Sequence, residues 1–262
     1  MTCQELINEL KAMAATPIDE NQTCDTFKSG DPSAEIVGIA VSMFATPDVV
    51  RKASECGANL LIVHEPTYYN HFDTEKNDCP PASLKEKLIK DSGITIFRFH
   101  DYAHSCSPDL ICEGELKYSG LKGEFREGKY SAVNDFILDE PMSALQLAKT
   151  LEEKLGIKHI RIAGNAHAEG RKISCNFGTP GHLVESLAES DFVLTGEICE
   201  WQLGEIARDY GQLGFNKAIL VMGHIGSERA GMKHLADILV QRHPELSIQY
   251  IECGEVYSYS KR

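Results

Sequence analysis

Short apolar runs alternate along the chain with longer segments in which apolar residues recur at helical spacing. The apolar runs are rich in Ile, Val, Leu and Phe, which is typical of buried strands. We predict strands over 35–41, 60–63, 94–99, 129–138, 159–163, 172–177, 192–194, 217–222 and 247–251. We predict helices over 3–14, 47–57, 82–92, 143–155, 179–189, 200–210 and 227–242, with one more beginning near 107–108. Residues 15–34 and 73–81 are predicted loops.

Several of the predicted helix ends carry the residues that cap helices. Thr2 is followed by Glu5, a capping box, and Thr46 precedes Pro47 at a first helical position. Gly93 and Gly156 stand where helices are expected to stop. Strands that alternate with helices in this way indicate an α/β fold with mixed, mostly parallel sheets flanked by helices. The two strands at 159–163 and 172–177 are predicted to pair as a hairpin.

One strand-helix-strand pattern occurs twice. Thr46 is followed by a helix, an apolar strand and Glu65, and Thr179 is followed by the same sequence of features and Glu197. The threonine and glutamate lie 19 residues apart in the first copy and 18 in the second. The repetition predicts two similar lobes, 1–125 and 126–262, facing each other across a cleft. The C-terminal helix and strand could instead pack back on the first lobe.

Three of the ten histidines stand at the carboxyl ends of predicted strands. His64 follows Leu-Ile-Val, His100 follows Ile-Phe-Arg-Phe, and His224 follows Leu-Val-Met-Gly. In an open α/β sheet these strand ends form the crevice where ligands bind. Each histidine also has another donor close by in the sequence: Glu65 for the first, Asp101 and His104 for the second, and Glu228 for the third. We therefore expect these residues to form one site.

Imidazole and carboxylate groups together suit Zn, Fe, Mn, Co or Ni, and the absence of Cys-x-x-Cys pairs argues against a structural zinc site. The donors outnumber what a single ion with an open position requires. Two divalent ions about 3.5–4 Å apart would use them, and such centres activate water for hydrolysis of phosphate, amide or ring C–N bonds. The expected cofactors are therefore two divalent metal ions in the cleft.

Other site types have little support. The chain contains no Gly-x-x-x-x-Gly-Lys-Ser/Thr, Gly-x-Ser-x-Gly or Gly-x-Gly-x-x-Gly motif. We expect Glu197 to be a general base or a partner of a ligand, and Tyr68 and Tyr69 are weaker candidates because of their position after a strand. The remaining histidines considered are expected to be structural or on the surface: His71, His167, His182, His234 and His243.

Composition and charge restrict the class of protein. The 262 residues are 42% hydrophobic and 25% charged, as in ordinary globular proteins. No apolar run approaches the ~20 residues of a membrane span, and the first residues do not resemble a signal peptide. The net charge of −13 argues against general nucleic-acid binding. Nine scattered cysteines fit reduced thiols and a cytoplasmic location.

Four segments together resemble a known family. They are Thr46-Pro-x-Val-Val, Leu-Ile-Val-His64-Glu65-Pro66, Leu-Thr-Gly196-Glu197 and Gly223-His224-x-x-Ser227-Glu228-Arg229. Their order and rough spacing are similar to those of the NIF-three-like dinuclear-metal proteins, known as type 2 homologues of GTP cyclohydrolase I. The resemblance covers nearly the whole chain. It implies two α/β lobes, a two-metal site and a ring-shaped homo-hexamer.

The resemblance assigns ligand roles to His64, His100, His104, His224 and Glu228. The chain departs from the family at two positions: Glu65 stands where most members have a second histidine, and His104 stands where many have aspartate. Asp101 could supply the carboxylate in place of His104, and the sequence leaves both possibilities open.

The resulting hypothesis is a cytoplasmic metal-dependent hydrolase acting on a small molecule that is phosphate-containing, nucleotide-like or a cyclic amide. The alternative is a non-catalytic metal-binding or regulatory protein whose oligomer is a scaffold.

Overall fold

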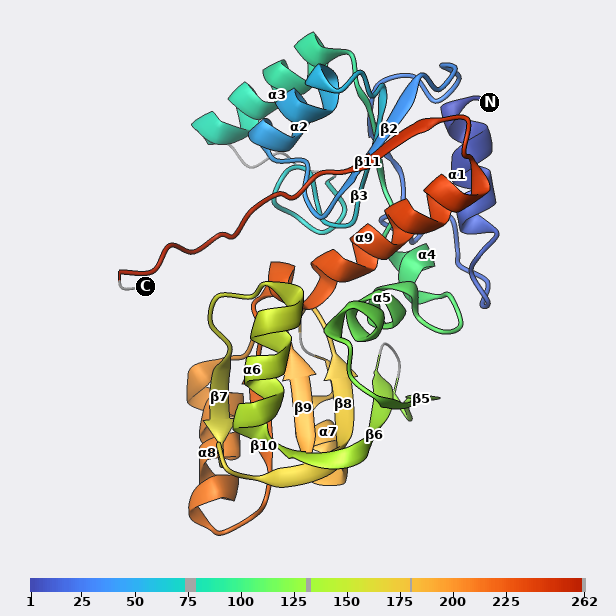
Figure 1. Cartoon of the computed structure of the whole chain (residues 1–262). Helices are drawn as coiled ribbons and strands as arrows, with labels where there is room; N and C mark the ends of the chain where they lie inside the picture. Colours follow the sequence, from blue (N-terminus) through green and yellow to red (C-terminus); the bar gives the residue numbers. More distant parts are fainter. Residues whose placement is uncertain (74–78, 131–132, 180, 261–262) are drawn as a thin grey trace. The chain divides into compact units, whose positions relative to one another are not determined.

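The fold was taken from a computed structural model, which describes residues 1–73, 79–130, 133–179 and 181–260. The chain forms two compact units (Figure 1). Unit 1 comprises Met1–Ile111 and Gly231–Arg262, and unit 2 comprises Cys112–Ala230. The chain passes from one unit to the other within helix α5 (Leu110–Ser119) and again within helix α9 (His224–Arg242). From the sequence we expected a division near residue 125, with the packing of the C-terminal helix and strand on the first lobe as an alternative.

Unit 1 contains a five-stranded sheet of order β1-β4-β3-β2-β11. Its central strands β2 (Gly38–Ser42), β3 (Leu60–Val63) and β4 (Thr95–Arg98) are parallel, and β11 (Ser247–Tyr250) joins them in parallel beside β2. The short edge strand β1 (Phe27–Ser29) pairs antiparallel with β4. Because β3 and β4 run side by side in the same direction, the residues that follow them leave the sheet at the same edge.

Both faces of this sheet are covered, as its almost wholly apolar strands require. Leu60 and Ile62 of β3 pack with α1 (Cys3–Lys11) and the unit 1 part of α9. Leu61 and Val63 of the same strand pack on the other face with α2 (Pro47–Glu55) and α3 (Pro80–Ser92). Figure 1 shows α2 and α3 side by side on one side of the sheet. Successive side chains of β3 therefore pack alternately against the two layers of helices, which fixes the face that each residue presents.

Unit 2 contains a six-stranded sheet of order β5-β6-β8-β9-β10-β7. Strands β8 (Glu169–Asn176), β9 (Phe192–Thr195) and β10 (Ala218–Val221) are parallel. The outer strands β5 (Gly123–Glu127), β6 (Asn134–Ser143) and β7 (Arg161–Gly164) pair antiparallel. One face packs on α6 (Ala144–Leu155), and the other on α7 (Leu183–Glu189) and α8 (Glu205–Gln212).

Most of the predicted elements are confirmed. The β3 range is the predicted one, and the capping box of Thr2 and Glu5 is formed at α1. The repeated strand-helix-strand pattern is present in both units, as β2-α2-β3 and as β8-α7-β9, each with parallel strands. Together the two sheets and their helices give the α/β class expected from the sequence.

Five details of the prediction are wrong. The strands β7 and β8 do not form a hairpin, because β7 pairs with β10 while β8 lies between β6 and β9. Strand β1 lies within a predicted loop, α4 (Asp101–His104) was not predicted, and β5 was missed before β6. Helix α9 begins at His224 rather than after Ser227. Residues 74–78 of a predicted loop, 131–132 of a predicted strand and Pro180 of a predicted helix lie outside the described residues.

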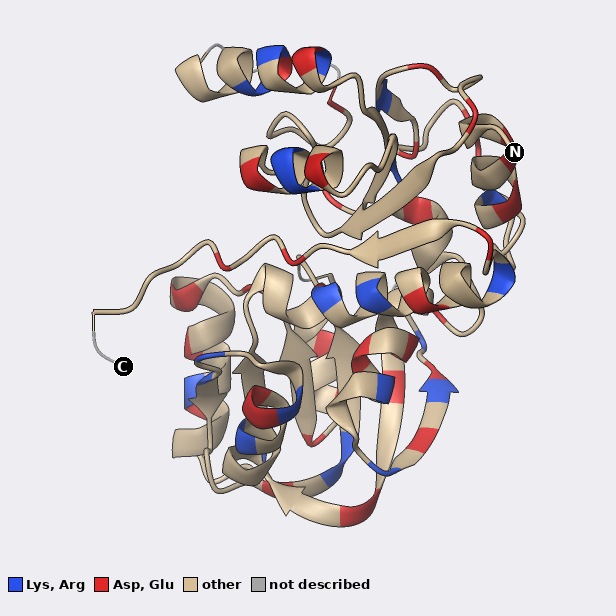
Figure 2. Cartoon of the chain, turned by 45° about the horizontal axis from the view of Figure 1, so that its top comes forward, with Lys and Arg blue, Asp and Glu red and all other residues tan. Residues whose placement is uncertain are grey.

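Charged side chains are distributed mainly over helices and connecting segments (Figure 2). The central strands β2, β3, β9 and β10 contain no charged residue, which agrees with their burial on both faces. Within the described part of the chain, none of the helices has the length and apolar character needed to cross a membrane.

Candidate metal centre

Three histidines converge at one edge of the unit 1 sheet. His64 follows β3 and His100 lies two residues after β4, so the parallel pairing of Val63 with Arg98 brings both to the same edge. His104 lies one helical turn after His100, at the end of α4. The ring centroids are 4.5 Å apart for His64 and His100, 5.1 Å for His64 and His104, and 4.9 Å for His100 and His104.

This arrangement suits a metal ion. One nitrogen of each of the three rings can be chosen so that all lie within 4.8 Å of one another. His64 is fully buried. Burial, together with the neighbouring rings of His100 and His104, lowers the pKa of His64 well below its usual range. The ring is therefore a neutral imidazole at neutral pH, the form that coordinates metal.

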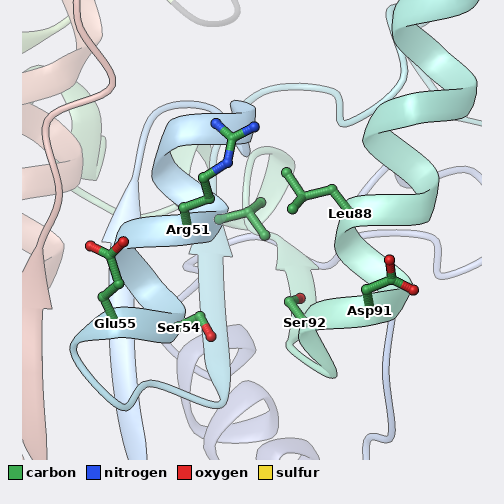
Figure 3. A pocket seen from close by; sticks show the side chains of 7 residues that line it. Arg51, Ser54, Glu55, Leu88, Asp91 and Ser92 are labelled. Carbon is green, nitrogen blue, oxygen red and sulfur yellow. The ribbon is translucent and has the colours of Figure 1, made fainter.

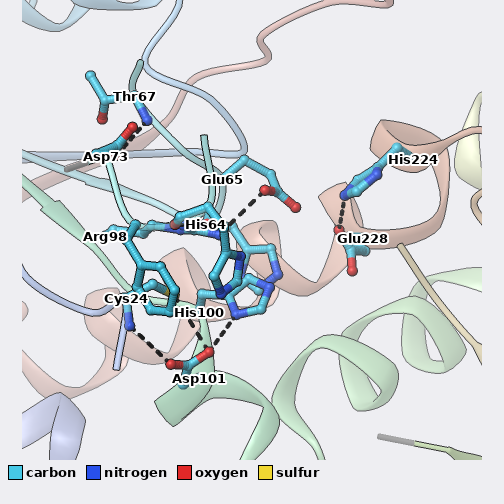
Figure 4. A network of polar contacts seen from close by, with 12 residues as sticks. Cys24, His64, Glu65, Thr67, Asp73, Arg98, His100, Asp101, His224 and Glu228 are labelled. Atoms are coloured by element: carbon cyan, nitrogen blue, oxygen red, sulfur yellow. Dashed lines mark hydrogen bonds and ion pairs between the residues drawn. The ribbon is translucent and has the colours of Figure 1, made fainter. Parts of the chain in front are cut away.

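Arg98 supports the strand end that carries His64. It is 1% exposed, and its Nε donates to the carbonyl oxygen of His64 at 2.8 Å. One of its terminal nitrogens donates to the carbonyl of His71, and the other lies 3.5 Å from Glu65 Oε2. A distance of 3.5 Å is long for a charge-assisted hydrogen bond. Glu65 is thus buried beside the histidines and neutralised by Arg98 without being tightly held by it (Figure 4).

A distant segment, residues 23–25, holds the loop that carries His100. Asp25 is 1% exposed and accepts the backbone N–H groups of His100, Asp101 and Tyr102 at 2.9–3.0 Å. This carboxylate satisfies the amides that the first turn of α4 leaves unpaired. No local sequence pattern indicates this role, because Asp25 lies in a polar stretch about 75 residues away from its partners.

Asp101 lies beside this group of three rings and bonds to one of them. Its Oδ1 is 2.8 Å from Nδ1 of His100 (Figure 4). Burial tends to raise the pKa of Asp101, but the hydrogen bonds from His100, from Thr23 and from the amide of Cys24 outweigh it and leave the pKa below its usual range. Asp101 is therefore ionised at neutral pH.

The candidate residues of unit 2 form their own group at the start of α9. His224 Nδ1 lies 2.8 Å from Glu197 Oε1, and His224 Nε2 lies 3.2 Å from Glu228 Oε2. Glu197 follows β9 and His224 follows β10, and these two strands are parallel neighbours. Glu228 is 2% exposed. A histidine and a carboxylate one turn apart on a helix are a common pair of metal ligands.

Two glycines allow the first turn of α9 to approach the strands. Gly178 N–H donates to Ser227 Oγ at 3.0 Å, and Ser227 Oγ donates to the carbonyl of His224 at 2.9 Å. A Cβ on Gly178 would meet the carboxylate of Glu228, and one on Gly196 would lie 2.9 Å from Ser227 Oγ. The segments 177–179 and 195–197, which contain these glycines, therefore help to position His224 and Glu228.

The weaker candidates lie around these groups. Burial raises the pKa of Tyr68 to about 12, so it remains protonated, and Tyr69 is 51% exposed. The ring of His71 lies 6.0 Å from that of His100, a proximity that the sequence did not suggest. Of the histidines expected to be structural, His182 stacks on Tyr130, and His243 bonds to Glu9.

A hollow on unit 1 lies away from the histidines. It has a volume of about 340 Å³ and lies between α2 and α3 (Figure 3). Its lining includes Arg51, Glu55 and Asp91, with Val50 and Leu88 as its apolar part. Its lining contains no histidine or cysteine and so lacks the imidazole donors that gather after β3 and β4.

The comparisons with known proteins agree with the fold and the residue pattern. The family model Duf34/NIF3 (NGG1p interacting factor 3) matches residues 1–255. A Clostridium perfringens protein named GTP cyclohydrolase 1 type 2 homolog is 23% identical over 235 residues, 87% of each chain.

Two solved structures have the same fold. Protein ybgI, described as of unknown function, has a TM-score of 0.79 with 21% identity over 98% of this chain and 100% of its own. A Bacillus cereus protein related to NIF3 has a TM-score of 0.79 with 14% identity over 99% of each chain.

Proposed function

Because the chain belongs to the Duf34/NIF3 family, we propose that it is a metal-dependent hydrolase with a dinuclear metal centre. His64, His100 and His104 are the proposed ligands from unit 1, and His224 and Glu228 are those from unit 2. The observation that carries the proposal is the convergence of three imidazoles on one sheet edge, with ligand atoms within 4.8 Å of one another. Zn, Fe, Mn, Co and Ni all suit imidazole with carboxylate.

A divalent ion held by these residues would supply Lewis-acid activation of water near neutral pH. The chain's own residues prepare the site for this. His64 is neutral, so binding does not require a proton to be removed from it. Arg98 and Asp25 fix the backbone on either side of the ligands through buried hydrogen bonds. The site is thus organised in advance, which reduces the cost of ordering it on binding.

Two carboxylates have further proposed roles. Glu65 is proposed as an additional ligand beside His64, because it follows His64 directly after β3 and its carboxylate is buried there. Glu197 has a side chain 57% exposed and within 2.8 Å of His224. It is proposed to orient that ring, or to accept a proton from water at the site.

The substrate is proposed to be a small molecule that is phosphate-containing, nucleotide-like or a cyclic amide. Such compounds contain the bonds that water activated by two metal ions hydrolyses. The name of the Clostridium perfringens relative points to the same chemistry. We also propose a homo-hexamer located in the cytoplasm, and the nine cysteines, all of them described and none of them in a disulfide, are consistent with a reducing compartment.

The test is turnover by protein reconstituted separately with each of the five metals. Substrates would be p-nitrophenyl phosphate, GTP and a cyclic amide such as hydantoin. We expect metal-dependent hydrolysis that His64→Ala abolishes. His167→Ala, which changes an exposed histidine in a turn of unit 2, should leave it unchanged. Tight metal binding without turnover on any of these substrates would contradict the hydrolase and favour a metal-binding scaffold.

A further inference from the structure

The candidate ligand histidines share one feature of their hydrogen bonding. In each ring, Nδ1 faces an oxygen atom: the carbonyl of Phe99 at 3.0 Å for His64, Asp101 at 2.8 Å for His100, and Asp109 at 2.8 Å for His104. In unit 2 the corresponding oxygen for His224 belongs to Glu197, also at 2.8 Å. A carbonyl or an ionised carboxylate only accepts hydrogen bonds, so Nδ1 must carry the hydrogen in the three rings of unit 1. In His224 both nitrogens face carboxylates, because Nε2 also lies 3.2 Å from Glu228, and the contacts do not select one tautomer.

This hydrogen determines which nitrogen can bind a metal. A neutral imidazole carries one N–H, so Nε2 holds the lone pair when Nδ1 is protonated. The hydrogen bond made by one ring nitrogen commonly fixes the tautomer of a histidine that binds metal through the other. The three rings of unit 1 are thus all prepared to coordinate through the same nitrogen.

Asp101 is already occupied by protein donors. Its Oδ2 accepts the Thr23 hydroxyl at 2.8 Å and the Cys24 amide at 3.1 Å. Its Oδ1 accepts His100 Nδ1 and lies 3.4 Å from the Cys24 thiol. To bind a metal ion it would have to give up these bonds. The carboxylates and thiol of Cys24, Asp25 and Asp101 are close enough to suggest a metal group, but their donors identify them as a hydrogen-bonded layer behind His100.

Asp109 has the same relation to His104. It is 6% exposed, and its Oδ2 receives His104 Nδ1 while its Oδ1 accepts the amide of Ile111 at 2.9 Å. The bond from Ile111 caps the first turn of α5. The Asp109 carboxylate is therefore held in place by the helix that follows His104 in the sequence. The sequence offered a partial signal, because Asp109 follows Ser107-Pro108 where a helix was expected to begin.

We propose that Asp101 and Asp109 are positioning residues and not metal ligands. Each holds one histidine in the Nδ1–H tautomer, which leaves Nε2 with the lone pair that could bind an ion, and their two negative charges would balance a bound divalent cation. The assignment rests on the proposed metal site, and it decides between Asp101 and His104 in favour of His104 as the ligand. Loss of such a partner typically weakens metal binding by about 10–100-fold.

Two measurements test the assignment. In metal-free protein, ¹H–¹⁵N correlation spectra of the histidine rings should show His100 and His104 as Nδ1–H tautomers. In Asp109→Asn the His104 tautomer should become mixed. This variant retains the α5 cap, because asparagine caps a helix as well as aspartate does. A Nε2–H tautomer in the wild-type protein would overturn the proposal whether or not the protein binds metal.

The second measurement is cobalt affinity by chelator competition, with X-ray absorption to count the imidazole ligands. Asp101→Asn and Asp109→Asn should each lower affinity by about 10–100-fold with the imidazole count unchanged. His104→Ala should remove one imidazole, and Asp48→Asn, at an exposed ion pair on α2, should change nothing. Unchanged affinity in both aspartate variants would contradict the proposal. Absence of cobalt from the wild-type protein would contradict the metal site itself.

Discussion

Gly178 provides a sharp test of how unit 2 positions Glu228. Its φ is +66°, in the left-handed region, and a Cβ there would meet Glu228 Oε1. In Gly178→Ala the backbone strain costs about 1–2 kcal/mol. Alanine also reduces the conformational entropy of the unfolded chain, which offsets about 0.4–1 kcal/mol of this cost. The backbone change alone is therefore worth about 1 kcal/mol of unfolding free energy.

Gly120→Ala is the matched control. Gly120 has a φ of +67° in the same unit, and a Cβ on it would meet nothing within 4 Å. The free-energy cost of placing alanine in a left-handed backbone conformation is therefore equal in the two variants, and they differ in the contact with Glu228. Because that contact is with the end of a flexible side chain, we expect the carboxylate to swing aside at a cost of up to about 1 kcal/mol. The displacement should appear mainly as weaker metal binding, by about tenfold or 1.4 kcal/mol.

The assays are urea denaturation of the metal-free proteins and chelator competition for the metal. Gly120→Ala should lose about 1 kcal/mol of stability with wild-type metal affinity. Gly178→Ala should be at least as destabilised and should bind metal more weakly. Equal stability and equal affinity in the two variants would refute the claim that Gly178 makes room for a carboxylate ligand.

Three other predictions concern unit 1. Burial lowers the pKa of Lys85 to about 8, so the folded protein binds fewer protons than the unfolded chain above pH 8. Stability should therefore rise by about 3 kcal/mol between about pH 8 and 10.5, and a urea series should show this rise disappear in Lys85→Met. Arg98→Met removes the cation beside the buried Glu65 carboxylate and should cost about 3–5 kcal/mol, partly recovered by adding Glu65→Gln; no recovery would count against the ion pair. Phe97→Ala empties a core position and should cost about 3–5 kcal/mol, whereas Phe72→Ala, at a side chain 48% exposed, should change stability by less than about 0.5 kcal/mol.

The parts of the site that follow strands could be predicted from sequence. An apolar run such as Leu60–Val63 determines both a buried strand and its end, and neighbouring parallel strands end at a common edge. This is why His64 and His100 could be placed near each other from local patterns alone. His104 was a candidate by its nearness to His100 and by the family resemblance, and the sequence left the choice between it and Asp101 open.

The supporting residues could not be predicted, because their partners are distant or their elements too short. Asp25 acts on amides about 75 residues away, and α4 has only four residues, too few for a helical period to be recognised. The hairpin prediction failed for a related reason. A polar turn between two strands suggests that they pair. Here β8 pairs with β6 on one side and β9 on the other, and β7 pairs with β10 instead.

The most direct test of the central claim is the number of transition-metal ions bound per chain after reconstitution and removal of excess metal. Elemental analysis should find about two ions in the wild-type protein, as a dinuclear centre requires. In the variant His64→Ala with His100→Ala it should find at least one fewer, while His167→Ala should match the wild type. Well under one ion per wild-type chain, for every metal tried, would contradict the account.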